Sequence, residues 1–130
     1  MTTFLDTNVL VYAQGDGSKA EIARKAILDG GTISVQVLNE CASVLRRKFH
    51  LEWDAVEAVV EDVCTALGAV RSLDVSTHTE ALDLARTHGL NFYDALILAS
   101  ALQAGCEVVL TEDLQAGRRI AGLTIVNPFA

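Results

Sequence analysis

Four acidic residues stand in apolar stretches of this 130-residue sequence, where a carboxylate is costly unless a partner or solvent compensates its charge. Asp6 lies within FLDTNVLVY, Glu40 ends ISVQVLNE, Asp94 begins DALILASAL and Asp113 ends VVLTED. Taken singly, three of the acids have an ordinary explanation, because Asp6 and Asp113 suit turns and Asp94 suits a helix N-cap. Taken together, they fit one pocket of carboxylates.

Such a pocket predicts a metal site, because clustered carboxylates repel one another until a hard divalent cation neutralises them. Oxygen ligands without histidine or cysteine suit magnesium or manganese better than zinc. The sequence therefore predicts Mg2+, or Mn2+, as the cofactor of a site formed by Asp6, Glu40, Asp94 and Asp113.

Other potential ligands are weaker candidates. The three histidines stand alone near predicted helix ends, and Glu112 alternates away from Asp113 on an extended strand end. The three cysteines are widely spaced among apolar residues, which indicates reduced core thiols rather than disulfides or a zinc site: Cys41, Cys64 and Cys106.

The elements that must position these acids alternate along the chain. Apolar β-type runs predict strands at 2–5, 32–33, 69–73, 107–110 and 123–126. Helical spacing predicts helices that start near residue 9 and at 19–29, 35–49, 54–67, 77–88 and 94–104. For the helix at 77–88, Thr77 and Glu80 match a capping box.

This alternation predicts an α/β fold, a three-layer α/β/α sandwich with a central parallel sheet of four to five strands, as a single domain over residues 1–130. Ligands of parallel sheets bind beyond the carboxyl ends of the strands, where Asp6 and Asp113 are expected. Asp94 and Glu40 fall in or near the first two turns of their helices, where the helix dipole favours an ionised carboxylate.

The net charge limits the classes of partner that the protein can attract. Seventeen acids against ten bases give a formal charge of −7, which disfavours non-specific attraction to nucleic-acid backbones or anionic membranes. Leaving out the four pocket acids gives −7 + 4 = −3, so part of the acidity belongs to the site. With no apolar run of membrane-spanning length and no signal-peptide pattern, we expect a cytoplasmic protein with no membrane partner.

Five spaced stretches carry a family resemblance: FLDTNVLVYA, ISVQVLNE, NFYDALILASALQAGC, VVLTEDLQAG and the terminal IVNPF. The sequence resembles the PIN-domain family, specifically the VapC-like toxins of bacterial toxin–antitoxin pairs, over essentially its whole length. The resemblance implies a magnesium- or manganese-dependent ribonuclease with a PIN-like α/β/α fold. It also implies three partners: an RNA substrate, a cognate antitoxin protein and a second copy in a homodimer.

The resemblance also implies roles for residues. The family's acidic quartet matches the four acids named above, and its supporting hydroxyl and amide positions match Thr111 and Asn8. Some members carry a further acid shortly after the last aspartate, but Leu114 and Gln115 follow Asp113 here, so no fifth ligand is expected from that segment.

Substrate phosphates need cationic contacts despite the overall acidity. We expect these from Arg118 and Arg119, the cations nearest in sequence after Asp113. Other basic candidates are Lys19, Arg24, Lys25 and the run 46–48. Aromatic residues make up only 5% of the chain, so shape or structured RNA is expected to dominate recognition over extensive base stacking.

Three alternatives stay open. A phosphoryl-transfer protein with an aspartate nucleophile also places acids at strand ends. It needs an Asp-x-Asp after the first strand or a second adjacent acid, together with a late lysine, whereas this chain has Asp6-Thr7-Asn8 and no lysine after Lys48. A PIN nuclease of general RNA processing and a non-catalytic PIN-like module that binds RNA or a partner also remain possible.

Overall fold

A computed structural model describes residues 2–130. In this range strands alternate with helices, in the order β1 (Thr3–Leu5), α1 (Thr7–Tyr12), α2 (Ser18–Leu28), β2 (Ile33–Ser34), α3 (Val35–Arg47), α4 (Trp53–Leu67), β3 (Val70–Arg71), α5 (Val75–His88), α6 (Phe92–Gln103), β4 (Val108–Leu110), β5 (Arg119–Ile120) and β6 (Leu123–Val126).

The main sheet has four strands in the order β1-β4-β6-β5. The pairs β1–β4 and β4–β6 are parallel, and β5 pairs with β6 in the antiparallel sense. Strands β2 and β3 form a separate parallel pair, which a single bridge between Phe4 and Thr32 links to β1. The predicted α/β class with a mostly parallel central sheet is confirmed, while the antiparallel β5 was not expected.

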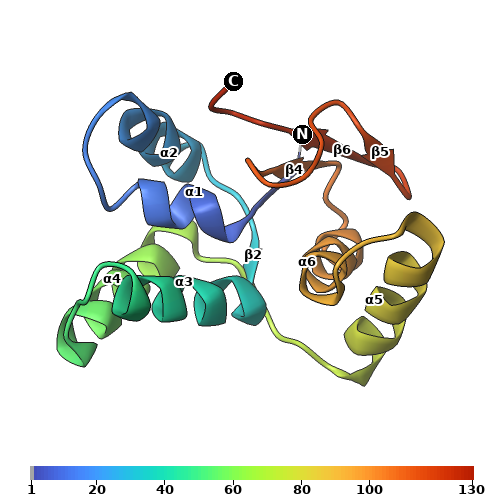
Figure 1. Ribbon diagram of the computed structural model, residues 1–130, viewed down its shortest axis with the longest axis horizontal. Helices are drawn as coiled ribbons and strands as arrows, with labels where there is room; N and C mark the ends of the chain where they lie inside the picture. Colours follow the sequence, from blue (N-terminus) through green and yellow to red (C-terminus); the bar gives the residue numbers. More distant parts are fainter. Residues whose placement is uncertain (1) are drawn as a thin grey trace.

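The helices form two groups on the two sides of this sheet. Helices α1 to α4 pack together on one side, and α5 and α6 pack together on the other (Figure 1). Helix α6 is the central one, because all seven residues from Ala95 to Ala101 are buried. Its nearly continuous apolar sequence therefore reflects packing on most of its sides.

Strand register brings Asp6 and Thr111 to one edge of the sheet. Leu5 of β1 lies opposite Leu110 of β4, so the residues that follow, Asp6 and Thr111, leave the sheet side by side. The backbone N–H of Asp6 donates to the carbonyl of Leu110 at 3.0 Å, which extends the pairing by one step. The carboxyl edge of the parallel strands is thus where Asp6 stands, as the strand-end argument predicted.

Three helices, α1, α5 and α6, begin two residues earlier than predicted, α1 at Thr7 rather than near residue 9. Helix α5 begins at Val75 with Asp74 as its N-cap, and the hydroxyl of Thr77 is the reciprocal partner in that capping box rather than its first residue. Helix α6 begins at Phe92, capped by the Asn91 side chain, which accepts from the N–H of Tyr93 at 2.9 Å. Asp94 therefore lies inside the first turn and is not the cap.

The cysteines are free thiols, and burial raises the pKa of the Cys41 thiol to about 11. This thiol is therefore protonated at neutral pH and is a poor metal ligand. Over residues 2–130, no helix has both the length and the apolarity that crossing a bilayer requires.

Candidate active site

Asp6 is the buried centre of the site, with 5% of its surface exposed. It is the N-cap of α1, and its Oδ1 accepts from the backbone N–H of Thr7 at 2.7 Å. Its Oδ2 accepts from the hydroxyl of Thr111 at 2.8 Å. Both carboxylate oxygens are therefore held by donors from the two segments that leave β1 and β4.

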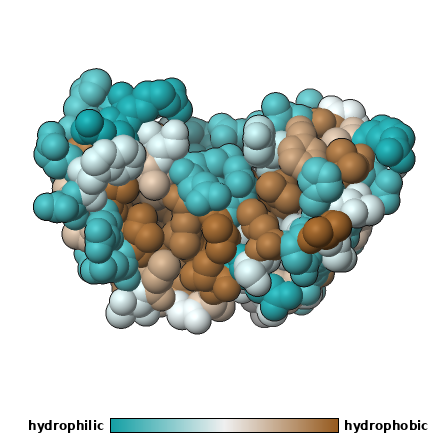
Figure 2. Space-filling view, turned by 90° about the horizontal axis from the view of Figure 1, so that it is seen from below, coloured by the Kyte–Doolittle hydropathy of each residue, from teal (hydrophilic) through white to brown (hydrophobic). Residues whose placement is uncertain are grey.

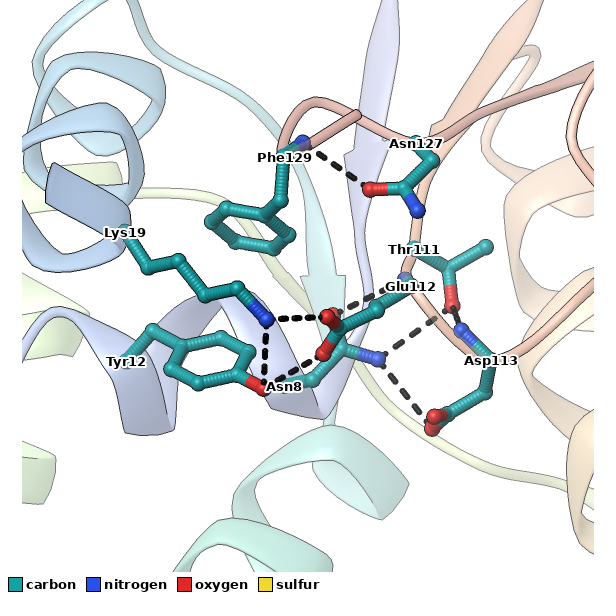
Figure 3. A network of polar contacts seen from close by, with 8 residues as sticks. All are labelled: Asn8, Tyr12, Lys19, Thr111, Glu112, Asp113, Asn127 and Phe129. Carbon is teal, nitrogen blue, oxygen red and sulfur yellow. Dashed lines mark hydrogen bonds and ion pairs between the residues drawn. The ribbon is translucent and has the colours of Figure 1, made fainter.

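Thr111 and Asn8 connect Asp6 to Asp113. The fully buried Thr111 hydroxyl accepts from the backbone N–H of Asp113 at 3.1 Å, and the Asn8 amide donates to the same hydroxyl at 3.3 Å. The same Nδ2 of Asn8 also donates to Oδ2 of Asp113 at 3.1 Å (Figure 3). These contacts fix the direction of a side chain that is otherwise exposed.

Glu40 and Asp94 reach the same place from two helices. Glu40 lies in the second turn of α3, and its Oε1 accepts from the Thr7 hydroxyl at 3.1 Å. Asp94 lies in the first turn of α6 and is half-buried. Hydrogen bonds thus join Asp6, Glu40 and Asp113 through Thr7, Asn8 and Thr111, whereas Asp94 interacts with the group through its charge.

Burial and the charges of neighbouring acids both raise the pKa of carboxyl groups at this site. Burial raises the pKa of Asp6, Glu40 and Asp94 above the ordinary carboxyl range. The charges of Asp113 and Asp94 raise the pKa of Asp6 further, and the charges of Asp6 and Asp94 do the same for Glu40. The hydrogen bond from Thr111 acts in the opposite sense on the pKa of Asp6, because it stabilises the ionised form.

All four acids line one open pocket of about 730 Å3. Helices α1 and α3 form one side of it, and the loop after β4 and the start of α6 form the other. Pockets of this volume are of the size that binds a small molecule or a few groups of a larger one. The structure therefore brings the predicted acids to a common, solvent-accessible cavity.

The donor set suits a hard cation, because it is made of carboxylate oxygens around a buried aspartate whose neighbours repel it. Within residues 2–130, however, no three carboxylate, imidazole or thiol groups converge closely enough, as their side chains lie, to enclose one ion. Magnesium does not require such a cage, since it keeps several waters and is usually bound through one or two carboxylates. The residues present therefore fit magnesium held partly by water.

Glu112 is directed away from this cluster. Its Oε1 pairs with the Lys19 ammonium at 2.6 Å, and its Oε2 accepts from the hydroxyl of Tyr12 (Figure 3). Its backbone N–H donates to Oδ1 of Asn8 at 3.2 Å. The Lys19 ammonium holds the pKa of Glu112 below its usual range, so the pair is ionised at neutral pH.

The contacts among Tyr12, Lys19 and Glu112 were not predicted from the sequence. The ring of Phe129 packs edge-on against Tyr12 with centroids 4.9 Å apart, and the Lys19 ammonium lies 4.9 Å from the centre of the Tyr12 ring. One signal was present in the sequence, because Tyr12 follows Asn8 by four residues and so shares its helix face. Nothing in the sequence predicted the contact between Lys19 and Glu112.

The structure places Arg118 and Arg119 away from the pocket lining. Arg118 donates to the carbonyl of His88, at the end of α5, at 3.0 Å. Arg119 lies in β5 and donates to the carbonyl of Gly122 at 3.3 Å. The cations that line the pocket are Arg47 and Lys48, at the end of α3. Phosphate contact by Arg118 and Arg119 stays a prediction.

Comparison with solved structures finds the same fold in toxin–antitoxin proteins. A toxin–antitoxin complex from Klebsiella pneumoniae has a chain that is 22% identical, with a TM-score of 0.71 and 98% of each chain covered. The DNA-bound VapBC of Salmonella typhimurium gives 24% identity, a TM-score of 0.70 and 96% coverage of each chain. VapC20 of Mycobacterium tuberculosis, a sarcin–ricin loop cleaving toxin, gives 18%, a TM-score of 0.71 and coverage of 86% of this chain and 90% of that one.

No curated protein matches the chain in sequence. The model of the PIN domain family matches residues 3–122, which includes all four acids and both supporting residues. The likeness to solved structures extends over the same region and beyond it. The chain belongs to the PIN domain family.

Proposed function

We propose that this protein is a metal-dependent endoribonuclease that hydrolyses RNA phosphodiester bonds with Asp6, Glu40, Asp94 and Asp113. The observation that carries the proposal is the convergence of these acids, from four separate segments, on one open pocket around the buried Asp6. A carboxylate that is buried, crowded by like charges and yet close to solvent is unfavourable for folding, and perturbed groups of this kind concentrate at functional sites.

The four carboxylates would hold Mg2+ or Mn2+, which when bound lowers the pKa of water and neutralises charge on the phosphate. Thr111 and Asn8 orient Asp6 and Asp113 through the hydrogen bonds described above. Glu40 and Asp94 line the pocket beside Asp6 and, in the ionised form that metal binding requires, would take part in holding the ion.

The biological part of the proposal is that the protein is the toxin of a toxin–antitoxin pair and acts on RNA in the cytoplasm. Support comes from the structural neighbours, which include a toxin–antitoxin complex, VapBC and a toxin that cleaves the sarcin–ricin loop. The partner is then a cognate antitoxin protein. A small reading frame next to this gene, whose product co-purifies with the chain and suppresses cleavage, is the expected observation.

A homodimer belongs to the same proposal. Several large apolar side chains are exposed on the surface, among them Val35, Trp53, Val75 and Leu82. Figure 2 shows apolar residues gathered side by side on one face of the molecule, with hydrophilic residues around them. Contiguous apolar surface of this kind typically marks an interface. Light scattering at micromolar concentration should therefore give twice the 13.9 kDa mass of the chain.

The test of the chemistry compares the native chain with Asp94→Asn on total RNA, with magnesium or manganese present. Asp54→Asn is the matched control, because Asp54 is also an aspartate in the first turn of a helix but is exposed and outside the pocket. Native protein and Asp54→Asn should cleave, and Asp94→Asn should lose at least about a hundredfold in rate. Equal cleavage by all three contradicts the carboxylate mechanism, and no cleavage by any of them favours a binding module.

A further inference from the structure

The pocket continues beyond the acids along one face of α3. Gln36, Glu40, Ser43 and Arg47 recur at intervals of three or four residues and all line it. Seven residues of helix separate Glu40 from Arg47, a rise of about 10 Å. The pocket therefore has an acidic end at Glu40 and a basic end at Arg47 and Lys48, a few nucleotides apart along an RNA strand.

Arg47 and Lys48 are available for an external partner. Both side chains are exposed, and within residues 2–130 neither takes part in an ion pair. The neighbouring Arg46 differs, because it donates to the carbonyl of Leu51 at 3.0 Å and its guanidinium lies 5.2 Å from the centre of the Trp53 ring. Two exposed cations in the lining of an otherwise acidic pocket are suited to bind an anionic strand that extends beyond the acids.

Two aromatic rings line the same pocket with large exposed areas. Tyr93 is 57% exposed and Phe49 is 55% exposed. Tyr93 directly precedes Asp94, its backbone N–H is bonded to the Asn91 cap, and its ring contacts Phe92 edge-on with centroids 5.6 Å apart. The ring is thus positioned by its neighbours while much of its surface remains open, which is the arrangement of a base-stacking platform.

We propose that Arg47, Lys48 and Tyr93 form a binding site for a single-stranded segment of RNA, with Arg47 and Lys48 on the backbone phosphates and Tyr93 stacked on one unpaired base. This proposal rests on the proposed nuclease function and assigns the residues that contact the RNA beside the acids. A base can stack on Tyr93 only if it is not already stacked between neighbours, which favours a single strand over a duplex at this pocket. Arg118 and Arg119, the cations expected from sequence, would lie outside this site.

The experiment measures binding without cleavage, so its outcome is separate from that of the nuclease test. A fluorescein-labelled single-stranded RNA of eight nucleotides is titrated by anisotropy into the Asp94→Asn protein, with magnesium, at several salt concentrations. Arg47→Gln/Lys48→Gln should weaken binding and reduce the slope of log K against log salt by about 1.4, since each phosphate contact on a single strand contributes about 0.7.

Lys25→Gln/Arg86→Gln is the matched control, because it removes the same charge from two exposed side chains that lie outside the pocket and pair with Asp29 and Asp83. It should leave the salt slope unchanged. The proposal is overturned if the control lowers the slope as much as the test variant. It is also overturned if Arg118→Gln/Arg119→Gln lowers the slope while Arg47→Gln/Lys48→Gln does not, or if no single-stranded RNA binds.

The stacking part has its own comparison. Tyr93→Leu should weaken binding of the single strand by about tenfold, within the range measured for one aromatic–base stack, whereas Tyr93→Phe should stay close to the parent protein. Binding of a duplex of the same sequence should be weaker and should not respond to Tyr93→Leu. Equal binding by Tyr93→Leu and Tyr93→Phe overturns the role of Tyr93, even if the native protein cleaves RNA.

Discussion

The ammonium of Lys19 and Oε1 of Glu112 form an ion pair at 2.6 Å that joins residues 93 positions apart in the chain. Glu112 directly precedes Asp113, and its backbone N–H is bonded to Asn8, the residue that also holds the Asp113 carboxylate. The pair therefore attaches the loop that carries one acid of the site to α2, at a point outside the acidic cluster. We therefore expect Lys19 to act as a positioning residue for Asp113.

Lys19→Met should lower RNA cleavage and metal affinity by about tenfold, because loss of an outer contact that orients a ligand typically costs 10–100-fold. Lys25→Met is the control, since Lys25 forms an exposed ion pair with Asp29 at 3.1 Å within its own helix segment. Lys19→Arg should restore most of the affinity. Titration calorimetry with Mn2+ provides the measurement, and a Lys19→Met affinity equal to that of Lys25→Met contradicts the positioning role.

Thr111→Val should destabilise the fold and shift the pH profile. The change removes the donor to Oδ2 of Asp6 and leaves a buried oxygen unpaired, at a cost of about 1–3 kcal/mol in unfolding free energy. The lost hydrogen bond had lowered the pKa of Asp6, so this pKa rises further and protons compete with the metal at higher pH. The acid limb of kcat/KM should move to higher pH.

Thr111→Ser keeps the hydroxyl and should preserve the native pH profile, with only the loss of a buried methyl group. Urea unfolding measures the stability of both variants, and the pH profile separates positioning from stability. A Thr111→Val enzyme that is less stable but has an unmoved acid limb would show that the hydroxyl contributes only to the fold.

Much of the fold was predictable because local signals and the final structure agree. The run before Asp6, the apolar stretch after Asp94 and the run before Thr111 each formed the expected strand or helix. The predicted starts of α5 and α6 were wrong because the true N-caps, Asp74 and Asn91, each lie three positions before a residue that could also cap the helix. Strand β5 was missed because two residues, Arg119 and Ile120, carry no periodicity.

The acids, and through the family resemblance the supporting residues Asn8 and Thr111, were expected from the sequence, whereas the contact between Lys19 and Glu112 was not. Asp6 and Asp94 were conspicuous because a charged residue is rare in an apolar stretch, and this contrast is visible in the sequence alone. Lys19 and Arg47 gave no such signal, because an exposed cation in a helix has the same local sequence whether or not it faces a pocket. Their positions follow from how α2 and α3 pack, which spacing alone does not encode.

Asp94→Asn should stabilise the metal-free protein at neutral pH. The pKa of Asp94 is raised in the folded state, so this group favours folding at low pH and that contribution is lost as pH rises through the raised pKa. Removing the charge should gain about 1 kcal/mol, or roughly 3–6 °C in Tm, near pH 7.5. The gain should vanish at pH values below the ordinary carboxyl range, where Asp94 is protonated in both states.

Asp54→Asn controls for the helix dipole, because it also removes an aspartate from a first turn but lies outside the pocket. The difference in Tm between the two variants, measured by calorimetry in EDTA at several pH values, reports the cost of an ionised Asp94 carboxylate in the pocket, which comes first from its burial and then from the charge of Asp113. A gain for Asp94→Asn that is the same at every pH would show that charge is not its cause.

Adding Mg2+ or Mn2+ should raise the Tm of the native protein, with about 2.7 kcal/mol expected at a metal concentration one hundred times the Kd. The ligands must be ionised to bind, and the pKa values of Asp6, Glu40 and Asp94 are raised, so protons displace the metal at a higher pH than they would from ordinary carboxylates. The metal-dependent gain in Tm should therefore shrink as pH falls toward the carboxyl range. Asp6→Asn should abolish the gain and Asp54→Asn should keep it, whereas a gain that is indifferent to acidification would place the bound metal outside the acidic pocket.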